Sequence, residues 1–177
     1  MRIVSGKFKG RQLYAPTDLP VRPTTDLAKE SLFNILRFKL DLDEIEALDL
    51  FAGIGSISYE LISRGARSVH AVDINPKCTA FIKETSERLK INNLQVFKQD
   101  AFLYPLQSKV SYDFIFADPP YQAEGIGTIP AHIFEGKVLK EQGLFVLEHS
   151  KEHNFASFPF FKEERHYGKV HFSFFSR

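Results

Sequence analysis

From residue 45 onward, short apolar segments alternate with amphipathic segments of helical length, and this rhythm constrains the fold more than any other feature. The apolar segments have the length and composition of buried strands. Such alternation is typical of a doubly wound α/β fold, a mostly parallel sheet with helices on both faces. The predicted strands are 45–51, 68–72, 94–98, 112–117 and 143–148, and the predicted helices are 56–64, 76–91 and 131–139.

The C-terminal tail predicts an antiparallel addition to this sheet. Residues 161–167 and 169–175 flank Gly168 and read as a hairpin. The two hairpin strands would complete a seven-stranded, mostly parallel sheet of Rossmann-like type.

The first 40 residues predict an extension that precedes the alternating pattern. Residues 3–5 and 11–14 flank a glycine-bracketed tip and read as a short β-hairpin. After a proline-containing loop, an amphipathic helix is expected to end near Lys39, with Thr24, Thr25 and Asp26 as possible N-caps and apolar residues that include Leu27 and Phe38. We therefore expect a hairpin-and-helix extension at 1–40 and a main domain at 41–177.

The net charge of +1 hides an asymmetry between this extension and the rest of the chain. Residues 1–40 carry a charge of +5 and the remaining residues sum to −4. A basic edge on an otherwise acidic domain is typical of a surface that binds a polyanion. The basic residues are Arg2, Lys7, Lys9, Arg11, Arg22, Lys29, Arg37 and Lys39.

Length and composition fit one ordinary globular domain of 177 residues. The sequence contains no run of about 18 apolar residues, so no membrane span is predicted. The first residues lack the apolar stretch of a secretory signal. The lone cysteine, Cys78, suits a reducing cytosol and falls at the spacing of a buried helix position. We expect a cytoplasmic protein in which Cys78 is a core residue.

Glycines and aspartates mark successive strand ends. The segment Asp49 to Gly55 crosses from the first strand into a helix, where glycines allow a ligand to approach the backbone. Position 58 holds serine in place of the third glycine of a dinucleotide fingerprint, which argues against a bound pyrophosphate. Asp73 ends the second strand, where a carboxylate can accept hydrogen bonds from ribose hydroxyls. Asp100 ends the third strand, where it could accept from an adenine amino group while the Ala101 N–H donates to the ring.

The fourth strand ends in Asp118-Pro119-Pro120-Tyr121. The two prolines stop the strand and remove two backbone donors, which leaves carbonyl oxygens for a ligand. A carboxylate, bare carbonyls and an aromatic ring together suit a flat molecule with an exocyclic amino group.

These residues resemble the class I S-adenosylmethionine-dependent methyltransferases that act on amino groups. More narrowly, the chain is similar to the bacterial 16S ribosomal RNA guanine-N2 methyltransferase family (RsmD type). This resemblance covers nearly the full length, although members typically carry serine where this chain has Ile54 and arginine where it has Lys9. The motifs that carry this narrower resemblance are residues 2–6, 10–13, 22–26, 30–34, 49–53 and 167–168.

The resemblance implies methyl transfer from S-adenosylmethionine to the exocyclic N2 of a guanine in small-subunit ribosomal RNA. It implies catalytic roles for Asp118, Pro119 and Tyr121, with the tyrosine stacking on a base flipped out of its helix. Lys7, Lys9, Arg11 and Arg22 are expected to contact the RNA. The expected cofactor-binding residues are Asp49, Phe51, Ala52, Gly53, Gly55, Asp73, Ile74, Asp100, Ala101 and Asp118.

Two alternatives stay open at this point. A DNA adenine-N6 methyltransferase shares the Asp-Pro-Pro-Tyr motif but normally needs a larger target-recognition domain than this chain has room for. A methyltransferase-like RNA-binding module without catalysis is the second. We expect no metal site, because the histidines show no paired ligand spacing within one element. We also expect a monomer. The substrate is either naked RNA or an assembled small-subunit particle.

Overall fold

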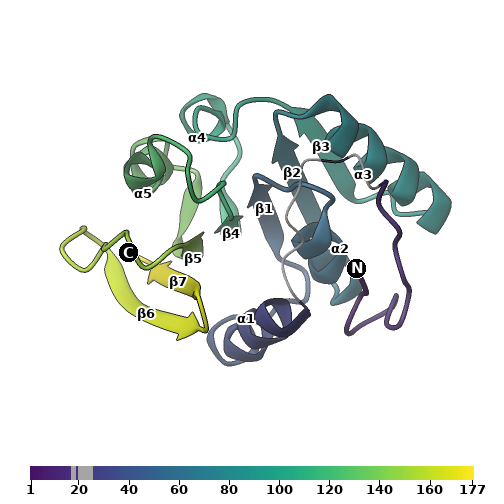
Figure 1. Cartoon of the computed structure of the whole chain (residues 1–177), viewed down its shortest axis with the longest axis horizontal. Helices are drawn as coiled ribbons and strands as arrows, with labels where there is room; N and C mark the ends of the chain where they lie inside the picture. The colour runs from purple at the N-terminus through teal and green to yellow at the C-terminus, as the bar shows by residue number, and fades with distance from the viewer. Residues whose placement is uncertain (17–18, 20–25) are drawn as a thin grey trace.

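The structure, a computed structural model, describes residues 1–16, 19 and 26–177 and is built around a seven-stranded sheet (Figure 1). The strands lie in the order β3-β2-β1-β4-β5-β7-β6. The strands are β1 (Glu46–Leu50), β2 (Ser68–Asp73), β3 (Leu94–Lys98), β4 (Tyr112–Ala117), β5 (Leu139–His149), β6 (Phe161–Tyr167) and β7 (Val170–Phe175). The helices are α1 (Asp26–Lys39), α2 (Ser56–Ser63), α3 (Pro76–Leu89), α4 (Tyr104–Gln107) and α5 (Ile129–Glu135), with a 3₁₀ turn, η1 (Ile126–Thr128).

The first five strands are parallel, and β7 and β6 form the antiparallel end that the sequence predicts. The chain moves outward from β1 to β3, then returns to place β4 on the other side of β1. The direction of winding therefore reverses between β1 and β4, which is the point where doubly wound folds bind ligands. The predicted fold class is confirmed.

Helices cover both faces because successive strand side chains point in opposite directions. On one face, Ala47 of β1 and Phe116 of β4 pack with α1, α2 and part of α3. On the other face, Leu48 and Leu50 of β1 pack with α4 and α5. Most of the C-terminal phenylalanines belong to these cores, whereas Phe160 is 41% exposed and stacks on Phe134.

Three details differ from the sequence predictions. The helix predicted at 131–139 is α5, which ends at Glu135, and β5 begins at Leu139, earlier than expected. The four-residue helix α4 is too short to give a periodic pattern. Leu27 and Phe38 were expected on the packed side of α1, yet they are 72% and 79% exposed, since the core takes the residues at positions 28, 32, 33 and 36.

The N-terminal segment folds back on itself but forms an isolated antiparallel bridge, Arg2 with Gln12, and no regular strands. Its turns need glycine: Gly6 has a φ of +77°, and a Cβ there would lie 1.7 Å from the Ser63 carbonyl oxygen. The segment is laid along α2, where Lys7 N donates to that carbonyl and Phe8 N donates to Ser63 Oγ. The extension at 1–40 thus shares its apolar core with the rest of the chain.

The buried carboxylate of Glu60 in α2 fastens this segment. Glu60 is fully buried and accepts hydrogen bonds from Val4 N at 2.8 Å and Ser5 N at 3.0 Å. Arg64 donates to the same carboxylate at 2.9 Å. The Lys29 ammonium, only 1% exposed, lies 3.9 Å from it. Lys29 was counted with the basic surface of the extension, but it is part of this interior network.

Replacing Glu60 by alanine should lower the free energy of unfolding by about 3–5 kcal/mol. The change removes the negative charge beside the buried Lys29 and the acceptor of the Val4 and Ser5 backbone N–H groups. Urea unfolding, monitored by circular dichroism, gives the change in the free energy of unfolding. The control is Glu44→Ala, which removes an exposed ion pair with Arg67 and should cost at most about 1 kcal/mol. Equal effects from the two variants would contradict the assigned role of Glu60.

Candidate functional site

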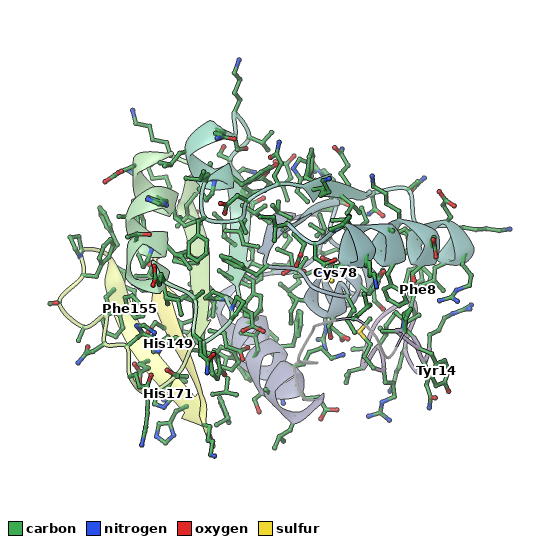
Figure 2. The ribbon with its side chains drawn as sticks, turned by 45° about the horizontal axis from the view of Figure 1, so that its top comes forward. Phe8, Tyr14, Cys78, His149, Phe155 and His171 are labelled. Carbon is green, nitrogen blue, oxygen red and sulfur yellow. The ribbon has the colours of Figure 1, made fainter. Side chains whose placement is uncertain are left out.

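A cavity of about 780 Å³ lies at the carboxyl ends of the parallel strands, beside the reversal between β1 and β4. Its lining includes the turn after β1, the ends of β2 and β3, the Asp118–Tyr121 segment after β4, and Glu148 of β5. Parallel pairing brings these segments to one edge although they are up to about a hundred positions apart in the chain. Cys78 is buried and lines the cavity. In the view of Figure 2 its label falls between those of Phe8 and Tyr14 in the N-terminal segment and those of His149 and His171 at the β5–β7 end.

The turn after β1 is shaped by left-handed backbone conformations. Phe51, Gly53 and Gly55 have φ values of 59°, 54° and 80°. The left-handed conformation is strained for a non-glycine residue such as Phe51, and strained backbone of this kind is frequent at functional sites. Phe51, Ala52 and Gly53 line the cavity, but Gly55 is not among the lining residues. A Cβ on Gly55 would lie 2.9 Å from the Tyr59 ring, so its glycine permits helix packing.

Asp73, at the end of β2, bridges two turns. Its Oδ2 accepts from Gly53 N at 2.8 Å and its Oδ1 accepts from Asn75 N at 2.8 Å. Asn75 caps α3 by accepting from the backbone N–H groups of Lys77 and Cys78. The Asp73 carboxylate is therefore held at a fixed position on the cavity wall, next to the exposed side chain of Ile74.

Asp100 and Ala101 close the β3 end of the cavity. Asp100 Oδ1 accepts from Phe102 N at 2.8 Å. The Phe102 ring meets Phe51 edge to face at 4.9 Å between ring centroids. This half of the cavity combines aromatic walls with a carboxylate, a combination suited to a flat ring that bears an amino group.

Asp49 lies deeper, beneath the glycine turn, and is 2% exposed. Its Oδ2 accepts hydrogen bonds from Ser58 N at 3.0 Å and from Ser58 Oγ. Desolvation by burial raises the pKa of Asp49 to about 7, although the bonds from Ser58 oppose that rise. Ser58, which the sequence marked only as a missing glycine, thus has a role of its own as the partner of Asp49.

The other half of the cavity is formed after β4. Asp118, Pro119, Pro120 and Tyr121 all line it, as the sequence predicts, and Ala123 N donates to the Pro120 carbonyl at 2.7 Å to close the turn. The Tyr121 hydroxyl donates to Glu148 Oε1 at 3.2 Å. The sequence interpretation did not single out Glu148, although this acidic residue lies near the carboxyl end of an apolar strand, as Asp73 does.

Three of the predicted RNA-contacting residues, Lys7, Lys9 and Arg11, are exposed, and none of these three lines the cavity. Lys7 and Lys9 surround the tip that packs on Ser63, whereas Ser56, at the other end of α2, lines the cavity. An eight-residue helix separates the two places by about 12 Å. Arg11 is exposed on the returning arm, and Arg22 lies outside the described residues.

Histidines that are scattered in the sequence come together on the β5–β7 end. His149 and His171 face each other in the register, and Glu164 lies 2.8 Å from His171 Nδ1. His149 Nε2 pairs with Ser173 Oγ at 2.8 Å, and burial lowers the pKa of His149. Among the residues that the structure describes, no group of three or more His, Cys, Asp or Glu is arranged to hold a metal ion.

The sheet order and the cavity at the reversal point define a class I methyltransferase fold. The solved structure of Escherichia coli yhhF, provisionally described as a methyltransferase, superposes with a TM-score of 0.88 at 26% identity, over 100% of this chain and 97% of that one. Within the described part of the chain, no helix is long and apolar enough to cross a membrane.

Sequence comparison narrows the class to a family. Residues 1–176 match the family model described as conserved hypothetical protein 95. Bacillus subtilis YlbH, provisionally named an rRNA methyltransferase, is 35% identical over 156 residues, which cover 86% of this chain and 84% of YlbH. Ribosomal RNA small subunit methyltransferase D of Buchnera aphidicola is 29% identical over 177 residues, which cover 98% of this chain and 90% of that protein. The chain belongs to the RsmD-type family of class I methyltransferases, which confirms the resemblance drawn from the sequence.

The buried Asp49 should make stability depend on pH. Because its pKa is raised in the folded state, its contribution is fully present below the unfolded value near 3.8 and is lost as pH rises through about 7. Relative to Asp49→Asn, the parent should lose on the order of 4 kcal/mol of unfolding free energy across this window. Urea unfolding of both proteins between pH 4.5 and 8 measures the difference. A difference that does not change with pH would contradict the raised pKa.

Proposed function

We propose that this protein transfers a methyl group from S-adenosylmethionine to the exocyclic N2 of a guanine in small-subunit ribosomal RNA. The observation that carries the proposal is a single cavity with two unlike halves: glycine and carboxylate strand ends on one side, and Asp118 to Tyr121 on the other. The name of the Buchnera relative supports ribosomal RNA as the substrate. We place this activity in the cytoplasm and expect the protein to act as a monomer.

The half of the cavity along β1, β2 and β3 suits the cofactor. S-adenosylmethionine supplies an electrophilic methyl group on a sulfonium, so no metal is needed to assist the leaving group. Asp73 would hold the ribose, since its two anchored oxygens keep lone pairs for both hydroxyls. Asp100 and the Ala101 N–H would take the adenine edge, with Phe51 and Ile74 against its faces. Asp49, Ala52 and Gly53 would border the methionine part, where Asp49 favours a cationic group. Gly55 would contribute by shaping the turn.

The half after β4 suits the acceptor base. The guanine N2 is a weak nucleophile because its lone pair is delocalised into the ring. Asp118 and the Pro119 carbonyl would accept its two N–H bonds, which favours pyramidal nitrogen and aims the lone pair at the methyl group. Tyr121 would stack on the flipped base. Positioning of this kind can lower a barrier by about 7–11 kcal/mol. The proton leaves N2 to Asp118 or to water after the methyl has transferred.

The direct test is to map ribosomal RNA methylation in a strain that lacks the gene. One guanine N2 in the small-subunit RNA should lose its methyl group and regain it when the gene is supplied. Purified protein should restore the methyl group on RNA or particles from the deletion strain. Methylation of DNA adenine, or no transfer to any nucleic acid, would reject the proposal in favour of one of the alternatives.

Asp73→Ala should weaken S-adenosylmethionine binding by at least about 1–3 kcal/mol, because two ribose hydroxyls lose their acceptor. Isothermal titration calorimetry gives the affinity, and circular dichroism confirms that the variant is folded. The exposed Glu84→Ala on α3 is the control and should bind as the parent does. Unchanged affinity in the Asp73 variant would remove Asp73 from the cofactor site.

Asp118→Ala should separate catalysis from cofactor binding. Methyl transfer should fall below detection or by at least about a hundredfold, since the acceptor amine loses its orienting partner. S-adenosylmethionine affinity, measured by calorimetry, should stay close to that of the parent. Near-normal turnover would contradict the proposed handling of an amino group at this position.

Neutralising Lys7, Lys9 and Arg11 together should weaken RNA binding and flatten its dependence on salt, because phosphate contacts release counterions. Cofactor affinity should not change, since these side chains lie about one α2 length from the cavity. The control replaces three exposed lysines elsewhere, Lys109, Lys137 and Lys162. If the variant's RNA affinity and its dependence on salt concentration equal those of the parent, the N-terminal tip has a structural role and does not bind RNA.

A further inference from the structure

Glu148, the next-to-last residue of β5, lies on the wall of the cavity and is only 4% exposed. An acidic side chain is rarely buried to this degree without a specific use, because desolvation of its charge is costly. It lies on the acceptor side, because β5 adjoins β4. Asp73 ends β2 and Asp100 follows β3, and both strands lie at the other side of β1. Its position sets it apart from the proposed cofactor contacts.

The register of the sheet places Glu148 beside Asp118. Ala117, the last residue of β4, pairs with Leu147 of β5, so Asp118 and Glu148 each follow directly after a paired residue. Adjacent strands are about 4.7–4.9 Å apart, and both side chains line the one cavity. The Tyr121 hydroxyl, 3.2 Å from Glu148 Oε1, joins the same group. Two carboxylates and one aromatic ring thus surround the place where the base is proposed to enter.

Two adjacent carboxylates match the edge of guanine and do not match that of adenine. Guanine presents N1–H beside N2–H₂, a row of donors, whereas adenine presents N1 as an acceptor beside its amino group. An ionised carboxylate only accepts hydrogen bonds, and its two oxygens offer about four acceptor positions, so Glu148 can serve a base as well as Tyr121. Opposite an adenine, the same carboxylate would face the N1 acceptor, so the two groups would repel each other and form no hydrogen bond.

We propose that Glu148 is a specificity-determining residue that accepts the N1–H of the target guanine while Asp118 and the Pro119 carbonyl engage N2. This inference rests on the proposed guanine-N2 methylation. It assigns to β5 the choice of base that the Asp-Pro-Pro-Tyr motif does not make, since that motif suits any exocyclic amine. Tyr121 is held against the same carboxylate, so the stacking ring and the edge-reading group form one unit.

The test compares guanosine with 2,6-diaminopurine riboside at the mapped nucleotide, in small-subunit particles reconstituted with each RNA. Diaminopurine keeps the N2 amine, so the nucleophile is still present, but its N1 is an acceptor. The parent should prefer guanosine in kcat/KM by about 10- to 100-fold, the discrimination expected of a paired hydrogen-bond contact. In Glu148→Gln the amide can donate to N1, so the preference should fall to near unity or reverse.

A second comparison separates base reading from support of Tyr121. If Glu148 acts on the base, Glu148→Gln should reduce the preference in a Tyr121→Phe background as it does in the parent. A preference that Glu148→Gln leaves at the parent value, or changes only when the Tyr121 hydroxyl is present, overturns the inference. Glu152→Gln, an exposed residue four positions on, is the matched control and should keep the parent preference.

Folding and the proposed function are checked in the same experiment. Calorimetry should give Glu148→Gln an S-adenosylmethionine affinity within about twofold of the parent, and Glu148→Asp should retain guanosine preference if the first variant proves unstable. Absence of methyl transfer to guanosine by the parent would reject the proposed function itself. Transfer by the parent with no preference over diaminopurine would reject the role of Glu148 alone.

Discussion

Parallel pairing of β2, β1, β4 and β5 is the constraint on which the rest of the structure depends. In a parallel pair all carboxyl ends lie at one edge, so residues from four separate strand ends meet around one cavity. The reversal of winding between β1 and β4 leaves room there, since the helices that follow these strands run off in opposite directions. Without this parallel pairing, Asp73 and Glu148 would not line the same cavity.

The N-terminal segment is bound to this framework through polar contacts to the buried side chains of Glu60 and Lys29. Glu60 receives backbone N–H groups from the segment and charged donors from Arg64 and Lys29, and Lys29 Nζ also donates to the Arg2 carbonyl at 2.5 Å. Lys29 reaches Ser56 Oγ at 3.5 Å, and Ser56 begins α2 at the cavity. The network therefore ties the segment with the exposed Lys7 and Lys9 to the helix that frames the site.

The cavity divides its chemistry along the sheet. Toward β3, backbone turns anchored by Asp73 and Asp100 present fixed acceptors between aromatic walls. Toward β5, Asp118, Glu148 and Tyr121 present acceptors and a ring for a second molecule. Asp49, beneath the boundary, has a pKa of about 7 because burial opposes its charge, so a cation bound nearby would favour its ionised form.

The fold class and about half of the residues that line the cavity follow from the amino-acid sequence alone. Strand and helix periodicity is a local property, and strand ends can be read from where apolar runs stop, which is why Asp73, Asp100 and Asp118 were found before any contact was known. The tertiary structure decided what depends on neighbours distant in the chain. It turned Lys29 from a surface charge into a buried partner of Glu60, gave Gly55 and Ser58 their roles in packing and in holding Asp49, and set Glu148 beside Asp118. Burial and strand register arise only when segments pack together, because no local pattern states which strand lies next to which or which charge faces the interior.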